Sequence, residues 1–337
     1  MPRRLAATFP LAFVLLLAGQ APAQSPPAFA QWPDTDFASA TVDLSEIVSG
    51  GVGRDGIPAI DDPDFVPAAE EDALEPREPV MTLALDGVPA RAYPLRYLTW
   101  HEIVNDEVAG IPVAVTFCPL CNTALVFDRR VAGEVLTFGV SGNLRHSDMI
   151  MFDRQTESWW QQAVGEGIVG HFAGARLEPL VSWVESWESF RRSHPGGLVM
   201  AEPDSARPYG RNPYVGYDSA SAPFLYFGEM PPHGMDPVAR VVRVGARAWP
   251  LARLAEAGEI REAGLTITWQ AGAASALDAA RIAEGRDVGQ IRVRDGTGAD
   301  VLHDVMFAFA FHAFWPEGTW MLGGQAAGCL DGCAADP

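Results

Sequence analysis

Two cysteines three residues apart are the side chains in this sequence best suited to chemistry. Cys118 and Cys121 follow the apolar run 111–117 and precede a second apolar run, 124–127. Thiols at this spacing can hold a metal ion, close a small disulfide or act as a redox pair. The residue after Cys121 is Asn122, so the C-x-x-C-H attachment of a c-type haem is excluded. The other three chemistries stay open.

A transition metal, copper or zinc, is the leading cofactor hypothesis. Two thiolates suit either ion, and solvent or the His101 imidazole could complete the coordination. A histidine and two methionines follow in 141–162, a polar segment around a predicted Met-rich strand. From this segment the predicted metal ligands are Cys118, Cys121, His146 and Met149. The competing interpretation places the methionines in the core and makes Arg145, Asp148 and Asp153 a buried ion-pair network.

The same cysteines support an enzymatic alternative, a thiol-redox or hydrolytic catalyst. In this hypothesis Cys118 and Cys121 carry the reaction, and His101 and Glu102 act as acid and base. A helix that began at Asn122 or just after it would favour the thiolate form through its dipole. Residues 100–106, WHEIVND, have part of the zinc-protease helix spacing but lack its second histidine, so a zinc protease is disfavoured.

A third hypothesis is a non-catalytic binding module with an inert disulfide. Trp159, Trp160 and the tyrosine-rich segment 207–218 would then contact a sugar or a protein partner. A second cysteine pair, Cys329 and Cys333, lies in a glycine-rich tail. This pair is expected to form a local disulfide, or to complete a four-cysteine zinc site if the tail docks.

Composition excludes several classes of function. The 337 residues carry a net charge of −19, which disfavours nucleic acid as a partner. All 24 basic residues are arginine. The absence of lysine excludes a Schiff-base lysine, pyridoxal-phosphate attachment and a P-loop. The partner, a small molecule or a protein, stays open.

The N-terminal residues predict export. Arg3 and Arg4 precede an apolar stretch, and Ala21-Pro22-Ala23 fits a signal-peptidase site. We therefore expect a periplasmic or secreted protein with no membrane span in the mature chain.

The pattern of elements predicts a strand-rich α+β fold. Strands are expected at 80–85, 90–93, 111–117, 135–139 and 149–152, with helices at 95–106 and, after a capping box at Ser182 and Glu185, up to His194. The segment RAYPLRYL at 91–98 returns as RAWPLARL at 247–254. Segment 116–125 then aligns with 268–277, which places Gln270 and Ala273 opposite the cysteines. This repeat predicts two related, duplicated modules packed together, with cysteines added to one copy.

The predicted organisation divides the chain into six parts. They are a signal peptide (1–23), a linker (24–40), a first module with the cysteine motif (41–204), a connecting loop (205–225), a second, degenerate module (226–325) and a cysteine-containing tail (326–337). We expect the site in the first module, near the interface between modules.

The chain resembles the bacterial family catalogued as domain of unknown function 3179. The resemblance runs from about Asp43 to about Gly324 and includes DLSEIVSGG, PVAVTFCPLCNTALVFDR and LTFGVSGNLRHSDMIMFDRQTESWWQQ. It implies that Cys118 and Cys121 belong to a shared motif, and it supplies no activity. Relatives often carry Asn where this chain has His146, which argues against His146 as an essential ligand.

Overall fold

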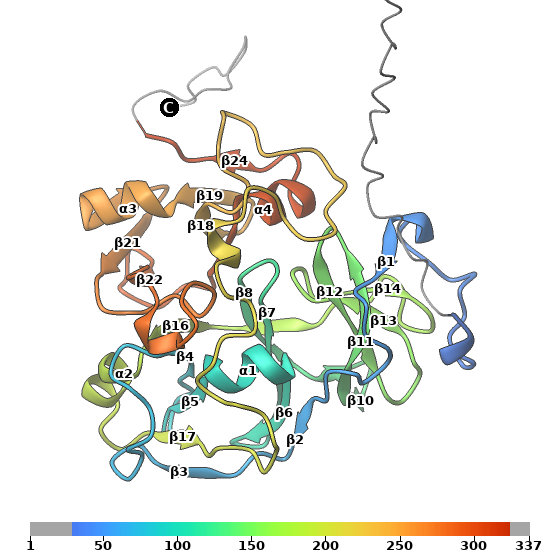
Figure 1. Ribbon diagram of the computed structural model, residues 1–337, viewed down its shortest axis with the longest axis horizontal. Coiled ribbons are helices and arrows are strands. Elements are labelled where there is room, and N and C mark those ends of the chain that lie inside the picture. The colour runs from blue at the N-terminus through green and yellow to red at the C-terminus, as the bar shows by residue number, and fades with distance from the viewer. Residues whose placement is uncertain (1–28, 324–337) are drawn as a thin grey trace, which may run out of the picture.

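The computed structural model describes residues 29–323 of the chain (Figure 1). The predicted signal peptide, residues 1–23, and the Cys329–Cys333 pair lie outside the described residues. None of the helices within residues 29–323 has the length and apolar character needed to cross a bilayer.

Two five-stranded sheets bear directly on the cysteines. One pairs its strands in the order β1-β11-β12-β13-β14, which span Ile47–Ser49, Phe138–Arg145, Asp148–Asp153, Trp159–Gln161 and Glu166–Val169. The other has the order β15-β8-β7-β6-β2, with bounds Glu178–Leu180, Thr123–Asp128, Ile111–Cys118, Ile103–Val108 and Ile60–Asp61. Strands β7 and β8 lie in the middle of the molecule, and the β11–β14 sheet stands to one side of them (Figure 1).

The remaining strands form three further sheets and a two-stranded ribbon. The order β16-β4-β5-β17-β3 covers Ser182–Ser186, Pro79–Leu83, Arg91–Pro94, Leu198–Met200 and Phe65–Pro67. The order β23-β18-β19-β24 covers Asp304–Phe307, Arg240–Val244, Arg247–Pro250 and Thr319–Trp320. The order β20-β21-β22 covers Glu259–Glu262, Leu265–Gln270 and Gln290–Arg294, and the ribbon pairs β9 (Arg130–Val131) with β10 (Glu134–Val135).

The helices are short. The four α-helices in the described part of the chain have seven residues each: α1 (Leu95–His101), α2 (Trp187–Ser193), α3 (Leu251–Ala257) and α4 (Ala308–Phe314). The predicted capping-box residues Ser182 and Glu185 lie in strand β16. Helix α2 begins after this strand, and the side chain of Ser186 caps it.

The prediction of an α+β fold made of two duplicated modules is wrong. The structure is strand-rich, and its helices are single short segments that link strands. The main hydrophobic core is continuous through both proposed modules, from Val48 through Val115 to Val241 and Phe311. Segments 91–98 and 247–254 both form a strand that leads into a helix, β5–α1 and β19–α3, so their similarity reflects a strand–helix unit that recurs within one fold.

The predicted helix 95–106 is also wrong in its second half. Helix α1 ends at His101 because Glu102 adopts a left-handed conformation, with φ of 61°. The chain then enters β6, where the β-branched Ile103 and Val104 pair with β7. His101 and Asn105 therefore do not share a helix face.

Candidate metal centre

The two cysteines lie in the turn of a β-hairpin. Strand β7 ends at Cys118, which pairs with Thr123 at the start of β8. Asn122 closes the turn with a φ of 54°, a left-handed conformation that asparagine tolerates better than most residues. No helix follows Cys121, so the predicted helix dipole does not act on the thiols.

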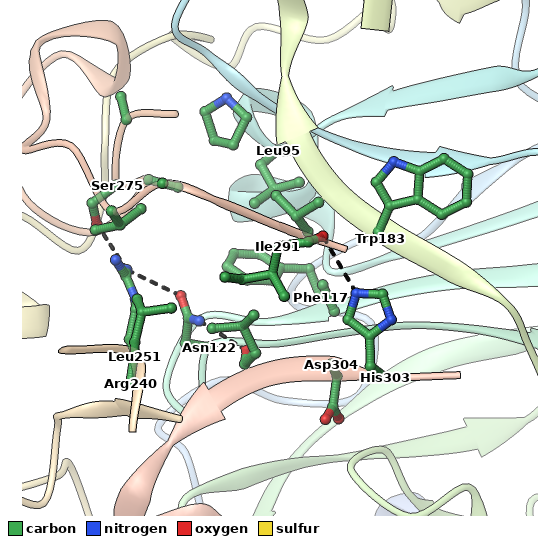
Figure 2. A pocket seen from close by; sticks show the side chains of 18 residues that line it. Leu95, Phe117, Asn122, Trp183, Arg240, Leu251, Ser275, Ile291, His303 and Asp304 are labelled. Atoms are coloured by element: carbon green, nitrogen blue, oxygen red, sulfur yellow. Dashed lines mark hydrogen bonds between the residues drawn. The ribbon is translucent and has the colours of Figure 1, made fainter. Parts of the chain in front are cut away.

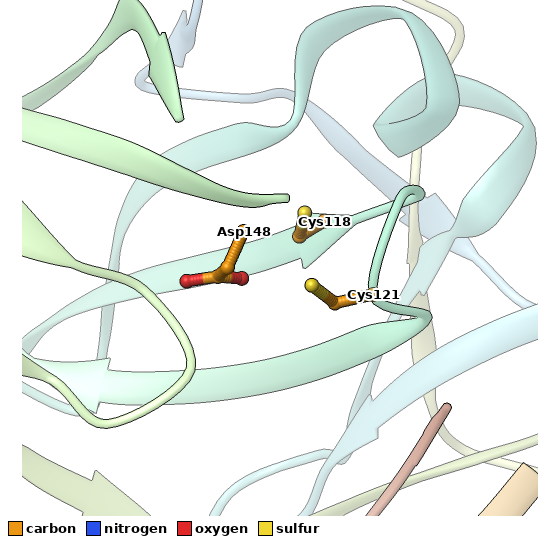
Figure 3. Close-up of side chains that lie close together, drawn as sticks. All are labelled: Cys118, Cys121 and Asp148. Atoms are coloured by element: carbon orange, nitrogen blue, oxygen red, sulfur yellow. The ribbon is translucent and has the colours of Figure 1, made fainter. Parts of the chain in front are cut away.

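Asp148 completes a cluster with the two thiols. One sulfur from each of Cys118 and Cys121 and one carboxylate oxygen of Asp148 all lie within 4.8 Å of one another, and all three residues are buried. Figure 3 shows the three side chains converging from the β7–β8 turn and from the adjacent sheet. Among the described residues this is the group of histidine, cysteine and acidic side chains that could hold a metal ion.

A tight turn places Asp148 at the thiols. His146 and Ser147 both have positive φ, 52° and 63°, and join β11 to β12 so that Arg145 pairs with Asp148. Two consecutive left-handed residues are the geometry of a two-residue hairpin turn. The turn also aims the backbone N–H of Met149 at Cys118 Sγ, with an N–S distance of 3.4 Å.

The two oxygens of Asp148 have different surroundings. Oδ2 accepts hydrogen bonds from Gln161 Nε2 at 2.6 Å and from the Ala163 N–H at 3.0 Å. Oδ1 is buried and, among the described residues, accepts no hydrogen bond from a backbone or amide donor, so the two thiols are the donors beside this carboxyl. A carboxylate oxygen that faces two thiols in this way has the arrangement of a metal-ligand site.

Burial controls the protonation of the cluster. It raises the pKa of the Cys118 thiol, and it raises that of Cys121 further, together with the neighbouring Cys118 and Asp148. Burial also raises the pKa of Asp148 to about 6, against the opposing effect of its hydrogen bonds. At neutral pH the metal-free cluster is therefore two neutral thiols and a largely ionised carboxylate.

Glu102 is a second buried carboxyl near the cluster. Burial raises its pKa to about 8, although a hydrogen bond from Tyr214 opposes the shift. The Tyr214 hydroxyl lies 3.4 Å from Glu102 Oε1. The left-handed backbone at Glu102, which ends α1, positions this carboxyl.

A pocket of about 350 Å³ adjoins the cluster. Leu120, between the two cysteines, and Met149, directly after Asp148, form part of its wall. Glu102, Tyr214 and Tyr217 contribute polar groups to the same pocket. A mostly apolar pocket with a few converging polar groups is the usual form of a small-molecule site.

The model of the family described as protein of unknown function (DUF3179) matches residues 54–318 of the chain. The chain belongs to the DUF3179 family. The resemblance found in the sequence is thereby confirmed. No curated protein and no solved structure gives a significant match.

In this DUF3179 protein neither predicted histidine ligand belongs to the cluster. The His146 imidazole lies 3.6 Å from the Glu46 carboxylate and packs near Phe314, with ring centroids 5.6 Å apart. His101 is held between the Pro58 carbonyl and the Tyr209 hydroxyl, at 2.7 and 2.6 Å. The Met149 contact with Cys118 is made by its backbone N–H.

Trp159 and Trp160 do not form the predicted binding surface. Trp159 and Trp160 are completely buried, so they are not available to a sugar or a protein partner. The tyrosine-rich segment instead packs over the site, where the Tyr217 hydroxyl donates to the Leu120 carbonyl at 3.0 Å. An inert disulfide between Cys118 and Cys121 is also absent, because both residues are free thiols in the structure.

Two members of this arrangement were missed or misassigned in the sequence. The competing interpretation of the sequence makes Asp148 part of an ion-pair network with Arg145 and Asp153, but Arg145 pairs with Glu46 and Asp148 with Gln161. The signal for Asp148 was an acidic residue at the start of an otherwise apolar strand, DMIMF. Tyr214 was noted only as part of a loop, and its contact with Glu102 depends on the fold.

Proposed function

We propose that this DUF3179 protein binds a divalent transition-metal ion of the zinc class through Cys118, Cys121 and Asp148. The observation that carries the proposal is the buried cluster itself, in which the sulfurs of two free thiols and a carboxylate oxygen of Asp148 lie within 4.8 Å of one another. Three protein ligands and one open position are typical of zinc sites that act on a substrate.

The donor set favours zinc over copper. Zinc accepts thiolate sulfur and carboxylate oxygen together, whereas Cu(I) prefers soft sulfur ligands alone. The copper site predicted from the sequence needs the imidazole of His146, which instead lies beside Glu46. Charge supports a divalent ion as well, because two thiolates and a carboxylate carry three negative charges in a buried space.

The direct test is metal uptake by the purified protein and three variants. Wild-type protein, C118S, C121S and D148N are loaded with Zn²⁺, dialysed and measured by elemental analysis, with Co²⁺ as a spectroscopic substitute. Wild-type protein should retain one ion and show thiolate-to-cobalt absorption, and each variant should lose both. A wild-type protein that retains no metal contradicts the proposal.

Asp153→Asn is the matched control for these variants. Asp153 is a buried aspartate on the same strand as Asp148, and it accepts a hydrogen bond from Trp160. It lies outside the cluster, so D153N should bind metal as wild type does. Equal loss of metal in D153N and D148N would show a general folding defect.

The second candidate function is enzymatic, and Glu102 favours it. A carboxyl with a pKa of about 8 that lines a pocket beside the cluster is suited to proton transfer near neutral pH. His101 is less suited, since both ring nitrogens are engaged and it does not line this pocket. In the hydrolytic form of the hypothesis Glu102, which is protonated at neutral pH, would give its proton to the leaving group, and a metal held by Cys118, Cys121 and Asp148 would supply the activation of water.

Hydrolase screening with wild-type and E102Q protein tests this second candidate. An activity that is lost in E102Q while the metal content is unchanged supports proton transfer by Glu102. The thiol-redox form predicts instead that activity survives metal removal and is lost in C118S.

Export belongs to the proposal as well. N-terminal sequencing of protein from the periplasm and culture medium should give a mature chain that starts near Gln24.

A further inference from the structure

Two side chains in the wall of the pocket beside the cluster are apolar and open to solvent. They are Val52 and Phe224, which are 39% and 46% exposed. The volume of the pocket, about 350 Å³, lies within the range of small-molecule sites, roughly 300–1,000 Å³. Covering apolar side chains at the rim of a pocket releases water and is favourable, so this rim suits an apolar ligand.

The backbone that carries the Phe224 ring is fixed by two hydrogen bonds. Its N–H donates to the Tyr217 hydroxyl at 3.1 Å, and its carbonyl accepts a hydrogen bond from Ser147. Ser147 belongs to the turn directly before Asp148, so this part of the rim is attached to the framework of the cluster. A ligand therefore does not have to order this segment when it binds, which lowers the entropic cost of binding.

No basic side chain lines this pocket within residues 29–323. The polar side chains of its wall are a carboxyl, an amide and two phenols: Glu102, Asn143, Tyr214 and Tyr217. The cavity shown in Figure 2 differs, because Arg240 and His303 belong to its wall. An anion in the pocket beside the cluster would be buried without a cationic partner and close to Asp148, which is costly.

The Glu102 carboxyl is the group in this wall that can donate a hydrogen bond to a ligand. The described residues give it one hydrogen bond, from the Tyr214 hydroxyl to Oε1 at 3.4 Å. Burial raises the pKa of Glu102 to about 8, and the negative charge of Asp148 raises it as well. Burial also raises the pKa of Cys118 and Tyr214, which interact with this carboxyl, so neither adds a charge at neutral pH. A protonated Glu102 can donate to an oxygen atom and offers no negative charge to a cation.

We propose that this pocket binds an uncharged, largely apolar small molecule that presents a carbonyl oxygen to the Glu102 carboxyl. Neutral esters, amides and ketones belong to this class, whereas carboxylates, phosphates and amines do not. Such a molecule would be the substrate of the enzymatic candidate, on which this inference builds, and its binding needs no metal ion in the cluster. Leu120 and Met149 line the same pocket next to the metal ligands in the chain, so the bound molecule would lie beside the cluster.

Three probes of similar shape and different charge test the selectivity. At pH 6.5, 2-naphthamide is neutral, 2-naphthoate is an anion and 2-naphthamidine is a cation, and each has a planar substituent on the same rings. Saturation-transfer NMR on the metal-free protein measures their dissociation constants. We expect 2-naphthamide to bind, and both ions to bind about tenfold more weakly or worse, because each would bury a charge without a partner. Equal or tighter binding of either ion, or no binding of 2-naphthamide, overturns the proposal.

Val52→Trp shows whether the probe occupies this pocket. Val52 is an exposed residue, so a larger side chain there should fill the entrance without disturbing the core. V52W should therefore lose 2-naphthamide binding. Val135→Trp is the matched control, because Val135 is 49% exposed and lies outside the pocket wall, and V135W should bind as wild type does. Equal binding by V52W and wild type contradicts this location.

Glu102→Leu and Glu102→Gln separate the hydrogen bond from the shape of the pocket. E102L has no donor and should bind 2-naphthamide about tenfold more weakly, because the carbonyl oxygen of the probe is then buried without a partner. E102Q keeps an N–H donor and should bind the probe more tightly than E102L. Equal affinities of E102L and wild type contradict the role of Glu102.

Probe binding and zinc uptake can fail independently of each other. Binding of 2-naphthamide by a metal-free protein that takes up no zinc supports the pocket ligand and contradicts the metal site. Zinc uptake without 2-naphthamide binding leaves the metal site in place and overturns the pocket ligand.

Discussion

Gln161 holds Asp148 in a fixed orientation. Its Nε2 group donates to Asp148 Oδ2 at 2.6 Å across the β12–β13 pair, and both side chains are buried. With Oδ2 occupied in this way, Oδ1 is the carboxylate oxygen left for another partner. A residue that orients a ligand from behind usually changes metal affinity strongly when it is replaced.

The first prediction concerns this orienting contact. Gln161→Leu should weaken Zn²⁺ binding by about 10- to 100-fold, because the Asp148 carboxyl loses a fixed donor. Competition with a chromogenic chelator measures the affinity. Gln155→Leu, a change on the exposed side of the hairpin, should leave it unchanged. Equal affinities in wild type and Q161L would contradict the assignment of Asp148 as a ligand.

The second prediction is a steep pH dependence of metal affinity. Burial raises the pKa of both thiols, so each must lose a proton before it can bind a metal. Protons compete with the metal, and affinity should therefore increase with pH by about 100-fold per unit above pH 6. Below the Asp148 pKa of about 6 the carboxyl adds a third proton and the slope steepens. Zinc titrations at several pH values check the slope, and a flat profile would exclude thiolate ligands.

The third prediction concerns Glu102 and stability. Its pKa is raised from 4.5 in the reference state to about 8 in the folded protein. Between these values the unfolded chain has lost the proton that the folded chain keeps, so metal-free stability should fall as pH rises from about 4.5 to about 8. Glu102→Gln removes this effect. E102Q should therefore gain stability relative to wild type with rising pH, on the order of a few kcal/mol at pH 8.

Urea denaturation at pH 5 and pH 8 measures that difference. An E102Q effect that is identical at both pH values would show that Glu102 is ionised in the folded state throughout.

The fourth prediction tests the close packing that forms the pocket wall. Gly142 has a φ of 78°, and a Cβ atom there would lie 2.2 Å from the Val52 carbonyl oxygen. Gly142→Ala should destabilise the fold by more than about 2 kcal/mol, through a steric clash in addition to backbone strain. Gly133 has a similar φ of 89° with open space around it, so Gly133→Ala should show the strain alone, about 1 kcal/mol. Similar losses for both variants would contradict the role of the contact.

The sequence predicted the strand that ends at Cys118 and most of the strand that begins at Asp148, because both are short apolar runs bounded by turn residues. It failed where one residue changes the chain direction. At Glu102, where φ is positive, helix α1 ends and strand β6 begins at the next residue. No local pattern in WHEIVND predicts that change.

The third ligand of the proposed site, Asp148, could not be found from sequence spacing. Cys118 and Cys121 are neighbours in sequence, but Asp148 belongs to another sheet, and its position depends on the His146–Ser147 turn and on sheet packing. The choice of His146 over Asp148 followed the general preference of metals for histidine. The structure turns that imidazole toward Glu46 instead.

The division of the cluster between two sheets has a consequence for assembly. Cys118 and Cys121 come from the β7–β8 hairpin, whereas Asp148 begins a strand of the β11–β14 sheet. A nascent hairpin can present only the two thiols, so the complete ligand set exists only after the sheets have docked. A metal held by all three residues would cross-link the two sheets, and its binding free energy would then contribute to holding them together.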